Sequence, residues 1–416
     1  VNALYSIVDR MYIGHMPGDG TLALSGIGLT FPITMLIAAF SCLPGMGGAP
    51  LASIALGEGN QKKAQKYLCN AITLLLAISV VMMAVCLLFL EPLLVLFGAD
   101  AETLPYASQY LTIYLFGTVF VEFALGLNPF INTQGHTVIG TMSVVIGAVV
   151  NIILDPIMIF GLGPVPQMGV AGAAYATVCG QVAAAVITAF GGVRRPPEFR
   201  KMKVYIKQIY WLGYASILQQ AMYTVYIVIL NAILAGFSDS AVTVLGLYYK
   251  MQTFFFIPLM GLQTCIVPVL SFNYATKSYG RCRETMKDSY LFSCGFMLIG
   301  GGCFVFFPVE LLRIFSDSSE VIAIGKTAFP IIGSSFIPAV FSLMTPVFFQ
   351  AIGNGRVSLF LSVMRQIFCL IPIFWALSLL GLQFTWFAFP ISEVLVGVTG
   401  MGVYWRTING WKNSRK

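Results

Sequence analysis

Long apolar runs, interrupted by Gly, Pro and charged residues, dominate the pattern along the chain. About 20 apolar residues suffice to cross a bilayer as a helix. The pattern predicts an all-α polytopic membrane protein with twelve transmembrane helices, the first truncated at its N-terminus because the chain opens inside an apolar stretch. The predicted spans are residues 1–14, 21–56, 67–90, 103–131, 138–161, 168–192, 205–236, 240–272, 287–308, 320–350, 357–380 and 384–407.

Composition supports a membrane protein. Of the 416 residues, 58% are hydrophobic and only 9% are charged, whereas soluble domains carry about 25% charged residues. The net charge of +7 is spread over short loops rather than one patch, which argues against nucleic-acid binding. The 9 cysteines form no C-x-x-C pair, so we expect plain thiols rather than a metal site or disulfides.

The basic residues indicate the orientation of the chain. Most of them lie in one set of loops and in the tail, including Lys62, Lys63, the run from Arg194 to Lys207, and Lys416. Cytoplasmic loops carry such an excess of Lys and Arg. We therefore expect a multi-pass protein of the inner or plasma membrane with a cytoplasmic C-terminus.

The two halves of the sequence repeat one another at a fixed offset. Pro50 and Pro268 differ by 218 positions, and the same offset relates Ser53 to Ser271 and Phe130 to Phe348. Six spans per half give both halves the same membrane orientation, as in parallel repeats. The predicted organisation is an N-terminal lobe at 1–192 (spans 1–6), a cytoplasmic linker at 193–204, and a C-terminal lobe with a short basic tail at 205–416.

Seven charged residues fall inside the predicted spans. Placing each there costs at least about 2.5–3.5 kcal/mol, so such residues either function or pair with one another. We expect structural or gating roles for five of them, with Lys250 pairing with Glu393 and Glu122 with Arg365 as two hypotheses. The seven are Asp9, Arg10, Glu122, Asp155, Lys250, Arg365 and Glu393.

Asp9 and Asp155 differ from the other five because each follows a polar partner at helical spacing. Tyr5 precedes Asp9, and Asn151 precedes Asp155, by four residues, so each pair shares one helix face. Desolvation and mutual repulsion would favour protonation of two carboxyl groups in one poorly hydrated pocket. Such a pair can hold a proton or a sodium ion. No other metal and no organic cofactor is expected.

Several motifs around these residues resemble those of the multidrug and toxic compound extrusion (MATE) family. The run Tyr5-Ser6-Ile7-Val8-Asp9-Arg10-Met11-Tyr12-Ile13-Gly14-His15 is similar to its first span. The runs Asn151-Ile152-Ile153-Leu154-Asp155-Pro156 and Met168-Gly169-Val170-Ala171-Gly172-Ala173-Ala174-Tyr175-Ala176-Thr177 resemble its fifth span and the start of its sixth. The segment Gly57-Glu58-Gly59-Asn60 resembles its loop between spans 2 and 3.

This resemblance implies two pseudo-symmetric six-helix lobes around a V-shaped central cavity. It implies export of amphipathic, often cationic, compounds in exchange for protons or sodium. In the DinF-like branch the coupling residues match Tyr5, Asp9, Asn151, Asp155 and Thr177, with a backbone contribution near Ala173. The chain departs from the family pattern at Arg10, where Thr is frequent, which adds a positive charge near the site. The interiors of spans 7, 8, 10 and 11 hold no Asp or Glu, unlike the NorM-like branch, so the DinF-like branch is favoured.

Aromatic and methionine side chains supply candidates for a substrate surface. Aromatic faces attract cations, and methionines adapt to different shapes. Ordinary helix packing or lipid contact is the alternative for each of them. The candidates are Met222, Tyr223, Tyr226, Tyr248, Met251, Gln252 and Phe254.

These observations favour a secondary multidrug exporter that acts as a monomer on small organic molecules by alternating access. A flippase for lipid-linked precursors is the alternative within the same superfamily. An intramembrane aspartyl protease would need Tyr-Asp and Gly-x-Gly-Asp settings, but Val8 and Leu154 precede the two aspartates. Without a Gly-x-x-x-x-Gly-Lys-Ser/Thr loop, an ATP-driven pump is not expected. We therefore predict that the protein is not an enzyme.

Overall fold

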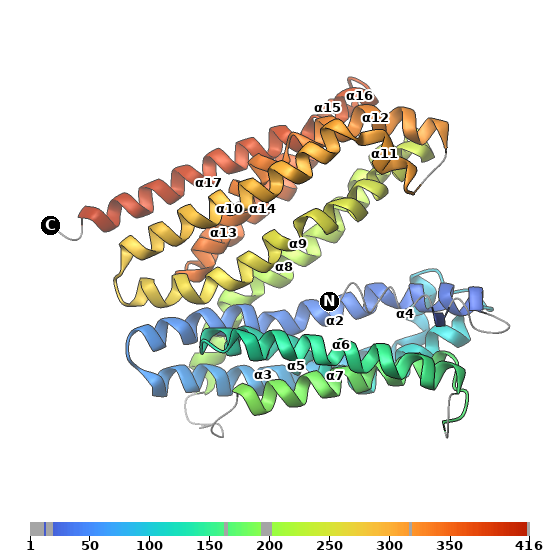
Figure 1. Ribbon diagram of the computed structural model, residues 1–416, viewed down its shortest axis with the longest axis horizontal. Helices are drawn as coiled ribbons and strands as arrows, with labels where there is room; N and C mark the ends of the chain where they lie inside the picture. Colours follow the sequence, from blue (N-terminus) through green and yellow to red (C-terminus); the bar gives the residue numbers. More distant parts are fainter. Residues whose placement is uncertain (1–11, 14–19, 162–164, 193–201, 316–317, 414–416) are drawn as a thin grey trace. The chain divides into compact units, whose positions relative to one another are not determined.

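A computed structural model describes residues 12–13, 20–161, 165–192, 202–315 and 318–413. The described residues form helices joined by turns, with no strand among them (Figure 1). They divide into two compact units: unit 1 comprises residues 1–53 and 60–217, and unit 2 comprises residues 54–59 and 218–416. The lobes and linker predicted from the sequence remain a prediction.

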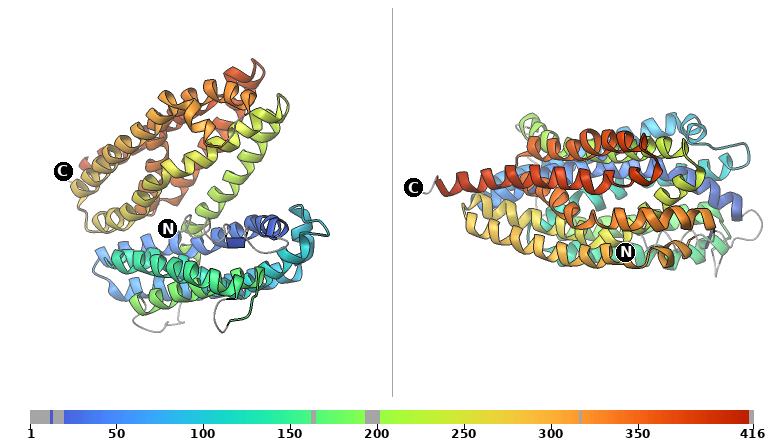
Figure 2. Two further views of the ribbon diagram at one scale, coloured as in Figure 1. Left: turned by 45° about the vertical axis from the view of Figure 1, so that its right-hand side comes forward. Right: turned by 90° about the horizontal axis from the view of Figure 1, so that it is seen from above.

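Unit 1 is a bundle of long helices. Its helices are most of α2 (Gly20–Gly57), α3 (Gln61–Leu88), the short α4 (Leu90–Leu96), α5 (Leu104–Thr133), α6 (Thr137–Phe160), α7 (Val170–Gly192) and the first half of α8 (Met202–Ala235). Helix α7 packs along both α5 and α6 (Figure 2). The α6–α7 approach is close because both helices present glycine: a Cβ on Gly147 would lie 2.8 Å from the carbonyl oxygen of Gly180. Small residues permit such backbone contact between membrane helices.

Unit 2 contains the remainder of α8 and the helices that follow it. These are α9 (Asp239–Ala275), α10 (Tyr279–Phe306), α11 (Pro308–Arg313), α12 (Ser319–Gly333), α13 (Phe336–Ala351), α14 (Gly355–Val363), the π-helix η1 (Met364–Leu370), α15 (Ile371–Ser378), α16 (Leu382–Thr385) and α17 (Ala388–Asn413). Its core is aromatic, with Phe304, Phe336 and Trp386 buried.

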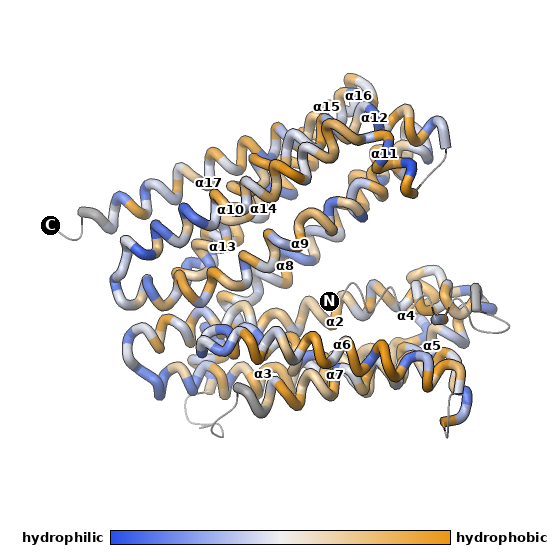
Figure 3. Tube along the Cα trace, viewed as in Figure 1, coloured by the Kyte–Doolittle hydropathy of each residue, from blue (hydrophilic) through white to orange (hydrophobic). Residues whose placement is uncertain are grey.

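The helices bear out an all-helical polytopic membrane fold. Among the described residues, 10 helices are long and apolar enough to cross a membrane, and the count reaches 11 when α12 and α13 are taken as one span. Nearly all of the predicted first span, 1–14, lies outside the described residues. Figure 3 shows hydrophobic colours along the helices and hydrophilic colours largely at their ends and turns, such as the α2–α3 turn.

Two spans are less regular than the sequence pattern predicts. The predicted span 320–350 is broken between α12 and α13, whose axes differ by 51°. The predicted span 357–380 contains η1 between α14 and α15. A π-helical stretch inserts a residue into the turn and often marks a functional position. Hydrophobic length alone reveals neither irregularity.

The internal repeat appears in the backbone of matching turns. Gly135 and Gly353, 218 positions apart, have φ of 82° and 80°. Their amides donate to the carbonyl oxygens of Asn132 and Gln350, which share the same offset, at 3.1 Å in both turns. Gly59 and Lys277 form a further pair, with φ of 74° and 56°. The same turn geometry therefore recurs at the offset of the predicted repeat.

Candidate functional site

Two polar residues of α6 meet one of α7 inside unit 1. The side-chain amide of Asn151 donates to Oδ1 of Asp155 at 3.1 Å, and lies 3.5 Å from the hydroxyl of Thr177. The contact with Thr177 is at the weak limit for a hydrogen bond. Asp155 is 0% exposed. Asn151 and Asp155 lie on one face of α6 because they are one helical turn apart. The close approach of α6 and α7 at their glycines brings Thr177 near Asn151.

The remaining residues of the predicted coupling site are only partly described. Tyr5, Asp9 and Arg10 lie outside the described residues, so their predicted roles stay predictions. Ala173 is fully buried on α7, one turn before Thr177. Its backbone contribution likewise stays a prediction.

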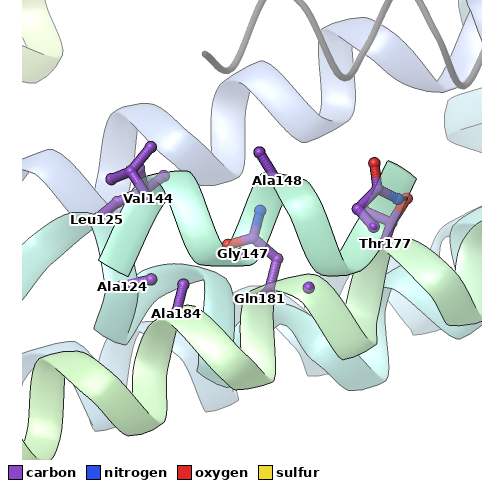
Figure 4. Close-up of a pocket in the computed structure, with 10 residues that line it drawn as sticks. Ala124, Leu125, Val144, Gly147, Ala148, Thr177, Gln181 and Ala184 are labelled. Atoms are coloured by element: carbon purple, nitrogen blue, oxygen red, sulfur yellow. Dashed lines mark hydrogen bonds between the residues drawn. The ribbon is translucent and has the colours of Figure 1, made fainter. Parts of the chain in front are cut away.

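A small cavity is lined by two of these three polar residues, Asn151 and Thr177, whereas Asp155 is not part of its lining. Its volume is about 30 Å³, compared with roughly 10–15 Å³ needed to hold one water molecule. Figure 4 shows Thr177 at one end and Leu125 and Val144 at the other. The lining residues are Ala124, Leu125, Val144, Gly147, Ala148, Asn151, Thr177, Gly180, Gln181 and Ala184.

The lining of this cavity is mostly apolar, and Asn151, Thr177 and Gln181 are its neutral polar members. The carboxylate of Asp155 accepts a hydrogen bond from Asn151. Oxygen donors of this kind favour hard cations and protons over transition metals. Among the described residues, no three His, Cys, Asp or Glu side chains converge on a metal position. Sequence reasoning missed Gln181, although it follows Thr177 by one helical turn.

Unit 2 holds a buried ion pair that differs from the predicted one. Nη2 of Arg365 on η1 lies 2.6 Å from Oε1 of Glu393 on α17, and Nε donates to both carboxylate oxygens. Ser342 of α13 also donates to this carboxylate. The hypothesis of a Lys250–Glu393 pair is therefore wrong, and Lys250 is exposed on α9. The hypothesis of a Glu122–Arg365 pair concerns residues of two different units and stays a prediction.

Glu122 has no partner among the described residues. It is 0% exposed on α5, and neither of its carboxylate oxygens has a hydrogen-bond partner in the described part of the chain. A buried polar group without a partner is uncommon and calls for a functional or structural reason.

Four tyrosines form a cluster in unit 2 that contains several predicted substrate residues. The ring of Tyr223 lies 5.3 Å from that of Tyr226, and Tyr249 lies 5.0 Å from Tyr248. Met222, Tyr226, Tyr248 and Met251 are buried, Tyr223 and Gln252 are half-buried, and Phe254 is exposed. For the buried four, packing inside the unit accounts for these positions. Their role in substrate binding stays a prediction.

Comparison with known proteins decides the family. The MatE family profile matches residues 1–157 and 215–376, which is most of the chain. The chain belongs to the MATE family. Members of this family are membrane transporters rather than enzymes, so this MATE protein is a multi-pass membrane transporter.

Curated relatives and solved structures extend the match over the whole chain. The FAD transporter of Shewanella oneidensis is 25% identical over 402 residues, covering 95% of this chain and 88% of that protein. The multidrug export protein MepA of Staphylococcus haemolyticus is 25% identical over 420 residues, covering 98% and 90%.

Two solved structures show the same fold. A crystal structure of MATE in the bent conformation has a TM-score of 0.89 at 22% identity, covering 99% of this chain and 93% of that one. An outward-facing structure of a multidrug resistance MATE transporter has a TM-score of 0.87 at 22% identity, with the same coverage. The MATE fold of this chain is therefore shown.

Proposed function

We propose that this MATE protein is a secondary exporter that antiports amphipathic or cationic organic compounds against protons or sodium by alternating access. The observation that carries the proposal is the buried contact between Asn151 and Asp155, with Thr177 and a cavity large enough for water beside it. A coupling ion drives a cycle only if it binds the two conformations unequally. A buried carboxyl group bonded to a residue that lines a small cavity offers such a difference, because hydration changes its affinity for a cation.

The finer assignments follow the motifs of the chain. We place the coupling site at Tyr5, Asp9, Asn151, Asp155 and Thr177, in the manner of the DinF-like branch. Protons are favoured over sodium because Asp9 and Asp155 can share one proton. The distribution of Lys and Arg supports a cytoplasmic C-terminus, and we expect the exporter to act as a monomer. Curated relatives named as multidrug export proteins support small organic substrates.

The decisive experiment measures efflux from proteoliposomes with pH and sodium gradients imposed separately. One of the two gradients should drive efflux by the wild-type protein. Asp155→Asn should abolish the efflux driven by that gradient, and Asp9→Asn should do the same. Asp288→Asn makes the same chemical change at an exposed position of α10 and should leave efflux intact. Full gradient-driven efflux in both site variants would refute the coupling role of these aspartates.

A second candidate function is export of an anionic aromatic compound. One relative is named as an FAD transporter, and unit 2 carries features suited to such a molecule. The rings of Tyr223, Tyr226 and Tyr249 lie 5.3–6.3 Å from one another and offer aromatic faces for a planar ring system. Parallel efflux assays with the aromatic cation ethidium and with FAD would separate the candidates. Saturable transport of FAD alone would favour the second.

A further inference from the structure

Glu122 is an intramembrane carboxyl group that the proposed coupling site does not use. It lies in the middle of α5, is 0% exposed, and has no hydrogen-bond or ion-pair partner among the described residues. Glu393, the other buried glutamate of the described spans, has Arg365 and Ser342 as partners. The contrast indicates that the two glutamates do not carry the same charge state.

The face of α5 that carries Glu122 packs against apolar parts of α2 and α3. Gly126 lies one turn further along and shares this face. A Cβ on Gly126 would meet the Leu75 side chain at 2.5 Å and the Ser41 carbonyl oxygen at 2.9 Å. Glu122 therefore lies on the same side of α5 as these contacts, and it is fully shielded from solvent there.

Among the described residues, the helices packed against α5 provide no charge at the level of Glu122; Asp9 and Arg10 of the predicted first span lie outside them. Helix α7 carries no charged residue, and the described part of α2 carries none. Lys66 is the last charged residue of α3 and precedes Leu75 by nine positions, about 13 Å along the helix. Glu91 lies in the short α4. The other titratable side chains on these helices are Cys42, Tyr67, Cys69, Cys86, Tyr175 and Cys179.

Asp155 on α6 is also distant from Glu122 along the bundle. Asn128 of α5 donates to the carbonyl oxygen of Gly140 in α6 at 2.8 Å, which sets these residues level in an antiparallel pair. Glu122 precedes Asn128 by six residues, so in this antiparallel pair it is level with position 146 of α6. Asp155 lies nine residues further along α6, which is about 13 Å along the helix axis. The two carboxyl groups therefore belong to separate positions of unit 1.

An ionised carboxylate in this position would be buried without a counter-charge or a hydrogen bond from the described part of the chain. Proteins avoid that state by neutralising the group. We propose that Glu122 is a second proton-binding site in unit 1: it is protonated in this conformation, and it releases the proton in a state of the transport cycle that lets water reach this face of α5. Its ligand is the proton itself. The inference concerns a residue outside the proposed coupling site and holds whether or not Asp155 couples transport.

Infrared spectroscopy of the full chain in lipid nanodiscs tests the protonation directly. The wild-type spectrum at neutral pH should contain the carbonyl stretch of a neutral carboxyl group, and Glu122→Gln should remove it. Glu122→Asp, which keeps a carboxyl group, should shift the band rather than remove it. Glu393→Gln is the matched control and should remove carboxylate bands instead. If Glu122→Gln also removed only carboxylate bands, the proposal would be overturned.

Proton counting tests whether the group exchanges its proton with solvent during the cycle. Ethidium addition to the nanodisc-embedded protein in weakly buffered solution should release protons, and Glu122→Gln should lower the number by about one per chain, since one carboxyl group binds one proton. Asp155→Asn separates the two sites, because the infrared band of Glu122 should survive in it. An unchanged proton count in Glu122→Gln would show that the group stays protonated throughout, which contradicts release.

Discussion

Nη2 of Arg365 lies 2.6 Å from Oε1 of Glu393, so a π-helical stretch of one span is joined to the final long helix by an ion pair. The carboxylate is the more buried partner, with 8% of the Glu393 side chain and 18% of the Arg365 side chain exposed. Ser342 adds a hydrogen bond to the same carboxylate, so three helical elements of unit 2 meet at Glu393.

Breaking this pair from one side should destabilise unit 2 strongly. Arg365→Gln leaves Glu393 buried without its counter-charge, which costs roughly 3–5 kcal/mol in comparable buried pairs. Glu393→Gln should lower the stability by a similar amount, because it leaves the guanidinium of Arg365 without its counter-charge. The apolar double variant Arg365→Met with Glu393→Leu should be less destabilised than either single variant. Thermal unfolding in detergent of the wild type, the two Gln variants and the double variant Arg365→Gln with Glu393→Gln forms the double-mutant cycle, and additive losses in it would contradict the coupling.

Gly59 and Lys277 occupy matching turns, and replacing them should change the unfolding temperature in opposite directions. Lys277 adopts φ of 56°, a left-handed conformation that costs an L-residue roughly 1–2 kcal/mol. Lys277→Gly should relieve this strain and raise the unfolding temperature. Gly59→Ala places a side chain in the equivalent left-handed turn and should lower the unfolding temperature, although no neighbour lies within 4 Å of the added Cβ. Equal responses of the two turns would refute the strain argument.

Asp100 should stabilise the start of α5 in a pH-dependent way. Hydrogen bonds from the hydroxyl and amide of Thr103, at 2.7 and 2.8 Å, hold the pKa of this exposed carboxyl below its ordinary value. Its contribution is therefore present at neutral pH and is lost as the pH falls through the lowered value, below about 3.9. Asp100→Asn should lower the unfolding temperature at neutral pH, and the difference from wild type should shrink in acid. Glu102→Gln, which leaves the Thr103 bonds in place, is the control.

Local and periodic features of the structure were accessible from the sequence, whereas contacts between distant helices were not. Asn151 and Asp155 are one turn apart, so their alignment follows from helix geometry. The partner of Glu393 was not predictable in this way, because hydropathy gives the depth of Arg365 and Lys250 but not the direction in which each points. The π-helix η1 adds to the difficulty, since an inserted residue rotates everything after it relative to an ideal helix. The lack of a partner for Glu122 among the described residues depends on the neighbouring helices α2, α3, α6 and α7, which no local pattern reports.

The close approach of α6 and α7 makes Gly180 a sensitive position of the candidate site. A Cβ there would lie 2.6 Å from the Gly147 carbonyl oxygen and 3.1 Å from Cβ of Asn151, so Gly180→Ala must push the helices apart. Overpacking of this kind costs about 1–3 kcal/mol, and displacement of Asn151 should reduce efflux by roughly tenfold or more. Gly28→Ala on α2 meets nothing within 4 Å and should be neutral or stabilising by about 0.4–1 kcal/mol. Unfolding temperatures and ethidium efflux of both variants check this, and unimpaired efflux in Gly180→Ala would show that the site tolerates a wider α6–α7 spacing.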